Sequence, residues 1–399
     1  MRPTRRQLLG AVGAGLVLPQ FARAASADER VFLFFYVEGG WDPAFVFTPL
    51  LGTSAYQESG ATEATFGAHT IVDHPDRLAV RFFFENHTDD ICLIHGMEVP
   101  SITHERCVRL LLTGATGGAA DWPTRLAGTG VAMPHLVLDG PVFPGDLPER
   151  VVRVGDQNQL SRLLEGQLGP YDEGLTPPPQ DVQALVDAHV RARAEAASGE
   201  HASRYASSLA GLERLQAEAA GLDFASQSPG CTRDFPADFE VIFDAFEAGM
   251  SRCVMLRHQG WCNQGWDTHQ LLQGQSDNFE DLFNTLFQLQ DALNSRPALA
   301  ERLVLIVASE MGRHPKLNAW GGKDHWTWTS AMLMGSGVRG GSVIGGLDDQ
   351  GRGRSVDLMT GETSEGGTAL GPEHLGATLL SLGGVEGGDA APILAALED

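Results

Sequence analysis

Lysine is scarce in this chain of 399 residues, because it occurs only at Lys316 and Lys323 and arginine supplies every other basic side chain. Acidic residues outnumber basic ones by 51 to 28, which gives a formal net charge of −23 at pH 7. Nucleic acid and anionic lipid surfaces are therefore not expected partners. An anionic substrate would have to be attracted by local positive charge or by a bound metal ion.

Cysteine is also sparse, with five residues and no C-x-x-C pair. This number and spacing exclude a fold built on a disulfide framework, and no iron–sulfur or haem signature is present. One disulfide is compatible with an oxidising compartment, and Cys253 with Cys262 is the most plausible pair because a predicted strand and loop separate them. Buried free thiols are the equal alternative.

The N-terminal segment lacks the length of a membrane span. Its apolar run "AVGAGLVLP" is far shorter than the roughly 20 residues that a transmembrane helix needs. The run follows "TRRQLLG" and precedes "ARA" at residues 22–24, which is the order of a twin-arginine signal peptide with its cleavage site. We expect residues 1–24 to be removed after export by the twin-arginine translocase, although an uncleaved anchor or a chance arginine pair is the alternative.

Export of this kind implies a periplasmic or secreted protein without a stable membrane anchor. Removal of residues 1–24 takes away four arginines and no acid, so the net charge would fall to −27. The remaining length is sufficient for one large α/β domain, residues 25–399. Twin-arginine substrates are exported folded, often with a metal or cofactor already bound.

Three apolar runs, "RVFLFFYV", "DDICLIHG" and "RLVLIVAS", predict buried strands of a mostly parallel sheet. Weaker strand candidates and amphipathic helical segments alternate with them, which predicts a three-layer α/β/α sandwich. Residues 178–222 break this alternation, and we interpret them as a helical insertion at the edge of the sheet. The glycine-rich stretch "GSGVRGGSVIGG" has no strand–GxGxxG–helix context, so no dinucleotide site is expected.

Two early strand ends carry candidate site residues. "VEGGWDP" places Asp42 on a Gly-Gly turn where a ligand can approach the backbone, although an Asp before Pro is commonly a turn former. "HGMEVPSITHERC" places Thr103 at the start of a helix, where unpaired N–H groups favour an anion. An ordinary N-cap role for Thr103 or Ser101 is the alternative.

Two later strand ends carry the rest. "GWDTH" sets Asp267 and His269 two residues apart, so that in an extended segment both side chains can reach one cation. "SEMGRHPKLNAWGGKDHW" contains further candidates for a metal shell and an oxyanion clamp, namely Glu310, Arg313, Asp324 and His325. A carboxylate combined with imidazoles suits zinc, manganese or iron better than calcium.

Taken in order, "GGWD", a Thr-His pair opening a helix that ends in "TG", "GWDTH", "SEMGR" and "GGKDHW" resemble the exported proteins known as domain of unknown function 1501. That family is grouped with the alkaline phosphatase-like superfamily of phosphatases, sulfatases, phosphodiesterases and cofactor-independent phosphoglycerate mutases. The resemblance runs from about residue 28 to the C-terminus and is loosest across residues 140–235.

The resemblance implies two metal positions. Asp42, Thr103 and Glu310 would hold one ion, and Asp267, His269 and His325 the second. Thr103 would be the nucleophile and Arg313 would bind the oxyanion of an anionic ester.

This sequence departs from the superfamily pattern where Glu310-Met311 replaces Asp-His, a change for which His104 or His314 offers a substitute imidazole. The close spacing of Asp267 and His269 is a second departure. One or two divalent ions are expected, zinc first, with manganese or calcium as alternatives.

The resulting prediction is an exported metallohydrolase that cleaves phosphate or sulfate esters. Its rival is a non-catalytic accessory protein on the same scaffold that binds an anionic polymer, a sugar or a protein. For that rival, a platform of tryptophans is expected near the site: Trp41, Trp266, Trp320, Trp326 and Trp328.

Overall fold

The structure is a computed structural model. It describes residues 25–53, 58–154, 160, 179–196, 198–199, 233–388 and 390–398, with a few isolated positions between 202 and 217. The expected signal peptide, residues 1–24, lies outside the described residues, as does much of the expected insertion.

An eight-stranded sheet forms the centre of the described part of the chain. From edge to edge it consists of β12 (Ser342–Ile344), β4 (Ile91–Glu98), β11 (Trp328–Gly335), β8 (Leu303–Ser309), β1 (Val31–Val37), β7 (Cys253–His258), β5 (His135–Val137) and β6 (Val151–Arg153). Strand β11 runs antiparallel to its neighbours β4 and β8, and the other pairings are parallel. The prediction of a mostly parallel sheet is confirmed.

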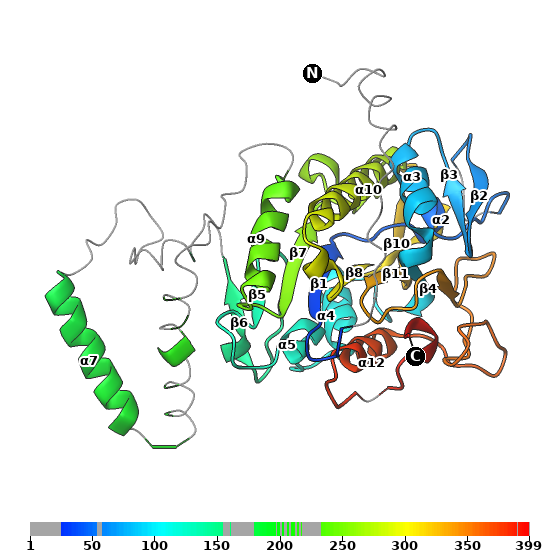
Figure 1. Ribbon diagram of the computed structural model, residues 1–399. Coiled ribbons are helices and arrows are strands. Elements are labelled where there is room, and N and C mark those ends of the chain that lie inside the picture. Colours follow the sequence, from blue (N-terminus) through cyan, green and yellow to red (C-terminus); the bar gives the residue numbers. More distant parts are fainter. Residues whose placement is uncertain are drawn as a thin grey trace, which may run out of the picture.

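Helices cover both faces of this sheet (Figure 1). One face carries α3 (Leu78–His87), α9 (Phe235–Glu247) and α10 (Gln273–Asn294); the other carries α4 (His104–Thr113), α5 (Trp122–Leu126) and α12 (Pro372–Leu382). Strand β1 alternates between the two cores, with Phe35 on the α10 side and Phe34 on the α12 side. The three-layer α/β/α sandwich is thus confirmed.

Shorter elements complete the described structure. They are α2 (Pro43–Val46), the hairpins β2 (Thr62–Phe66) with β3 (His69–Asp73) and β9 (Gly312–Leu317) with β10 (Lys323–Trp326), α7 (Gln180–Ala196), α11 (Pro297–Ala300), and the 3-10 helices η1 (Thr88–Asp90), η2 (Pro148–Arg150), η5 (Trp261–Asn263) and η6 (Leu394–Ala396). Helix α7 lies within the expected insertion, which follows the edge strand β6. Within the described residues, no helix is both long enough and apolar enough to cross a bilayer.

The cysteines differ from expectation. Cys262 is disulfide-bonded, but Cys253 is free and fully buried in β7, so the expected Cys253–Cys262 pair is wrong. Cys92 and Cys107 are also free and buried. Cys231 lies outside the described residues.

The parallel strands β1, β4, β7 and β8 bring their carboxyl ends to one edge of the sheet. In open α/β sheets, ligands bind beyond that edge. The segments that follow these four strands carry the candidate residues of the sequence.

Candidate metal centre

Three imidazoles surround the carboxylate of Asp267. Its Oδ1 lies 3.0 Å from Nε2 of His269 and 3.1 Å from Nε2 of His325, and its Oδ2 lies 3.4 Å from Nε2 of His104. The Nε2 atoms of His269 and His325 are 2.9 Å apart. We refer to these four residues as the Asp267 cluster.

The opposite nitrogen of each ring faces a hydrogen-bond acceptor. The Nδ1 contacts are His104 to Glu310 Oε1 at 2.9 Å, His269 to Asp324 Oδ1 at 3.2 Å, and His325 to the carbonyl oxygen of Ile102 at 2.6 Å. An imidazole that donates from Nδ1 presents a lone pair at Nε2, and this arrangement is typical of metal-binding histidines.

The donor set of the cluster fits a divalent cation. Three Nε2 atoms converge on one carboxylate, and one ligand atom each from His104, Asp267 and His325 lies within 4.8 Å of the others. Separations of about 3 Å are those of neighbouring ligands around an ion with bonds of about 2.1 Å. Because imidazoles dominate, zinc or manganese suits the set better than calcium, which prefers oxygen ligands.

A compact turn after η5 positions Asp267 and His269. The segment is not extended as expected, because the amides of Thr268 and His269 bond back two residues to Trp266 and Asp267. Trp266 anchors the turn, since its ring is fully buried and donates to Nδ1 of His258 at 3.1 Å. The turn still directs both side chains to the same point.

The β9–β10 hairpin brings in His325. In its register, His325 lies opposite Arg313. The amide of Asn318 at the hairpin turn binds Asp324 at 3.0 Å and the carbonyl of His269 at 2.9 Å. Gly322 is required there, because a Cβ would lie 2.3 Å from the carbonyl of His269.

Arg313 holds Asp267 in place rather than facing substrate. Its buried guanidinium donates to the carbonyls of Gly39, Gly40 and Trp266, and one terminal nitrogen lies 2.8 Å from Asp267 Oδ1. These partners occupy the guanidinium nitrogens that an oxyanion would need, so the structure differs from the expected oxyanion-clamp role. The geometry makes Arg313 a positioning residue.

The charges of the cluster are coupled. Burial raises the pKa of Asp267, but contacts with His104, His325 and Arg313 outweigh it and lower that pKa overall. Contacts with Asp267 and Glu310 raise the pKa of His104 to about 9. A proton on His104 and a metal ion therefore compete for the same carboxylate, and metal binding releases the proton.

Glu310 lies behind His104 and is not arranged as a ligand. The carboxylate is fully buried, and its Oε1 accepts both the His104 Nδ1–H and the backbone N–H of Gly39, each at 2.9 Å. The adjacent Met311 packs in a small apolar group with Val99 and Leu110. Met311 thus fills a core position where the superfamily pattern has histidine.

Asp42, expected at the other metal position together with Thr103 and Glu310, is engaged in an ion pair instead. Its Oδ1 accepts the N–H of Ala44 at 3.0 Å as the N-cap of α2, and its Oδ2 lies 2.5 Å from Nζ of Lys323. Both members of this ion pair are almost completely buried. Sequence reasoning assigned Lys323 no role, although the rarity of lysine was the available signal.

Thr103 stands next to the cluster without capping its helix. It occupies the N-cap position of α4, but its side chain makes no cap bond. Its exposed hydroxyl lies 3.3 Å from that of Ser101. Its chain neighbours are Ile102, which accepts from His325, and His104, which contacts Asp267.

The expected tryptophan platform is not formed as a unit. Trp41 and Trp266 are fully buried in the core. Trp320, in the β9–β10 turn, is 71% exposed. Trp326 is half-buried and donates to the carbonyl of Gly351 at 2.9 Å.

Several solved structures are similar to this chain. Ps i-CgsB in complex with k-i-k-neocarrahexaose matches with 9% identity and a TM-score of 0.43, over 92% of this chain and 75% of that one. The PsFucS1 sulfatase from Pseudoalteromonas sp. matches with 11% identity and a TM-score of 0.38, over 89% and 68%. The soluble domain of lipooligosaccharide phosphoethanolamine transferase A from Neisseria meningitidis matches with 10% identity and a TM-score of 0.39, over 94% and 96%.

A search of curated protein sequences finds no match. The family comparison covers the later part of the chain, including α10, the β9–β10 hairpin and three members of the Asp267 cluster. Residues 185–360 match the family described as protein of unknown function (DUF1501), the family that the sequence motifs resemble.

Proposed function

We propose that this protein is an exported metal-dependent hydrolase that cleaves phosphate or sulfate esters with Thr103 as the nucleophile. The observation that carries the proposal is the Asp267 cluster, in which three imidazole Nε2 atoms converge on one carboxylate. His104, Asp267, His269 and His325 would hold the ion. A divalent ion bound there, zinc first and manganese next, would supply positive charge that stabilises an ester oxygen in the transition state.

The proposal involves one ion site in the described residues, not two. The residues of the other expected site are engaged elsewhere, because Asp42 binds Lys323 and Glu310 binds His104. Glu310, Asp324 and Arg313 support the cluster by orienting His104, His269 and Asp267. Such outer partners fix the ring tautomers and strengthen binding.

Thr103 supplies the attacking oxygen in this proposal. Its Oγ1 would attack phosphorus or sulfur and the alcohol would depart, leaving an ester on Thr103 that water then cleaves. The helix that follows is ten residues long and offers unpaired N–H groups at its start, which favour the anionic group of the substrate. The exposure of Thr103 and its lack of a cap bond leave the hydroxyl available.

Zinc-loaded protein, assayed with 4-nitrophenyl phosphate and 4-nitrophenyl sulfate, tests this proposal. Thr103→Ala should lower kcat at least about a thousandfold with unchanged zinc content, while Thr103→Ser retains measurable turnover. Ser101→Ala is the matched control, because its hydroxyl lies two residues away in the same turn. Equal rates for wild type and Thr103→Ala on every ester tried would overturn the proposal.

One observation favours the alternative of a non-catalytic accessory protein. The guanidinium of Arg313 is occupied by backbone carbonyls and Asp267, so it is not available to an oxyanion. The alternative predicts zinc-loaded protein that turns over neither ester. The same assay therefore separates the two functions.

A further inference from the structure

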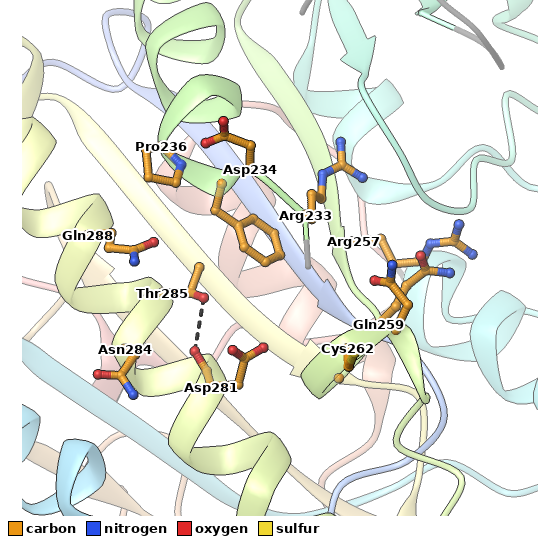
Figure 2. A pocket seen from close by; sticks show the side chains of 13 residues that line it. Arg233, Asp234, Pro236, Arg257, Gln259, Cys262, Asp281, Asn284, Thr285 and Gln288 are labelled. Atoms are coloured by element: carbon orange, nitrogen blue, oxygen red, sulfur yellow. Dashed lines mark hydrogen bonds between the residues drawn. The ribbon is translucent and has the colours of Figure 1, made fainter. Parts of the chain in front are cut away.

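A cavity of about 460 Å³ lies beside the carboxyl end of β7, between α9 and α10 (Figure 2). Its walls come from the loop after β7, from the start of α9 and from one face of α10. This volume is within the range of small-molecule sites. The members of the Asp267 cluster are not among the described residues that line it, so the cavity is a separate feature.

Helix α10 turns a polar stripe towards this cavity. Asp281, Asn284, Thr285 and Gln288 are spaced so that they share one face of the helix. The hydroxyl of Thr285 donates to the carbonyl oxygen of Asp281 at 2.9 Å, and its oxygen keeps acceptor capacity (Figure 2). The stripe therefore offers both donors and acceptors.

The two arginines of the wall are engaged by carboxylates. Arg257 lies 2.9 Å from Glu38 and 2.8 Å from Asp139. Arg233 lies 2.6 Å from the other oxygen of Asp139 and also contacts Asp238. Their positive charge is thus balanced by neighbouring carboxylates, and the described residues leave the cavity no excess of positive charge for an anion.

Among the described residues, Asp281 has no comparable cation. Its Oδ2 lies 3.3 Å from Nε2 of the buried His258. Nδ1 of His258 faces two donors, the N–H of Gly260 and the indole N–H of Trp266, each at 3.1 Å. Nδ1 must therefore accept, which puts the ring proton on Nε2, and within the described residues that N–H makes no hydrogen bond. Since Nδ1 accepts, the ring adds no positive charge beside Asp281, and the negative charge of this carboxylate is left for a ligand.

We propose that the cavity binds an amino sugar. Its ammonium group would pair with Asp281, and its hydroxyl groups would bond with the amides of Asn263, Asn284 and Gln288. A side-chain amide both donates and accepts, as a hydroxyl group does. A charged hydrogen bond to the carboxylate gives the amine its advantage over a hydroxyl at the same position.

Three disaccharides of one skeleton test this assignment: the β-1,4-linked glucosamine dimer, its N,N′-diacetyl form, and cellobiose. Calorimetry at about pH 6 with the full exported chain should show that the glucosamine dimer binds at least about tenfold more tightly than the other two. Asp281→Asn should remove that difference, since a charged hydrogen bond corresponds to about 10- to 100-fold in affinity. Asp277→Asn, which also removes one carboxylate but one turn earlier on α10, should leave the affinity difference between the disaccharides intact.

Asn284→Ala is a second variant at an exposed position, so its folding is not at issue. This variant should lower the affinity for the glucosamine dimer at least about threefold. No saturable binding of the dimer to the wild type, or equal binding of all three disaccharides, would overturn the assignment. These measurements do not involve the metal or ester turnover, so they stand independently of the proposed hydrolase function.

Discussion

The Nε2 atoms of His269 and His325 face each other at 2.9 Å. Acceptors also face the two Nδ1 atoms, Asp324 for His269 and the carbonyl of Ile102 for His325, so in the tautomers that donate from Nδ1 both facing nitrogens carry lone pairs. The nearby carboxylate of Asp267 adds negative charge. Arg313 balances the charge of this carboxylate from one side, and a metal ion bound between the two nitrogens would remove the repulsion between their lone pairs.

We therefore expect about one zinc ion per chain after equilibration and removal of free metal. Asp267→Ala and His325→Ala should each lower the zinc content below about 0.1 ion per chain, as measured by elemental analysis. Zinc should also raise the melting temperature of the wild type, because a ligand that binds only the folded state stabilises it. His314→Ala is the control, and full zinc content in His325→Ala would contradict the assignment.

Glu310→Gln should weaken zinc binding without abolishing it. Because Glu310 orients His104, we expect the dissociation constant to rise about 10- to 100-fold, while saturation still reaches one ion per chain. Competition with a chromogenic chelator measures this change. Complete loss of binding at saturating zinc would instead mean that Glu310 is itself a ligand.

Lys323→Met should strongly destabilise the fold. It leaves the carboxylate of Asp42 buried without its cation, which costs about 3–5 kcal/mol in the free energy of unfolding. The double variant with Asp42→Asn should recover part of this loss, as measured by guanidinium unfolding. The other lysine provides the control, because Lys316 is exposed and Lys316→Met should change stability by at most about 0.5 kcal/mol.

Stability should fall in mild acid partly through His95. Burial lowers the pKa of His95 to about 4, whereas in the unfolded chain it is near 6.5. Between these values the unfolded state binds the proton and the folded state does not. The free energy of unfolding therefore decreases as the pH falls from about 6.5 to about 4, by at most about 1.4 kcal/mol per pH unit for this group.

His95→Gln should make that pH dependence shallower, and denaturant unfolding at several pH values measures the slope. Comparison of slopes cancels unchanged groups such as Asp121, whose burial raises its pKa to about 6 and acts in the opposite direction. His314→Gln should keep the wild-type slope. Identical slopes for wild type and His95→Gln would refute the role of His95.

The fold was largely predictable because the strands β1, β4 and β8 are buried on both faces and so appear as continuous apolar runs. The antiparallel direction of β11 was not predictable, because the apolar sequence pattern of a buried strand is the same whichever way the strand runs. It runs back because the β9–β10 hairpin returns the chain after β8.

The site was predictable only in part. Strand ends indicated that Asp267 and His325 converge, since four parallel strands finish at one edge. The role of Glu310 depends on where α4 places the ring of His104, which no local pattern contains. Likewise, the pairing of Lys323 with Asp42 joins residues far apart in the sequence.

The position of β1 in the sheet has a consequence for biosynthesis. Phe32 pairs with Cys253 on one side and with Val304 on the other, so both partner strands are made long after β1. At about 5–20 residues per second, the apolar segment Val31–Val37 leaves the ribosome roughly ten seconds or more before either neighbour exists. During that interval it is an unpaired, aggregation-prone strand, and the central sheet can close only when most of the chain has been translated.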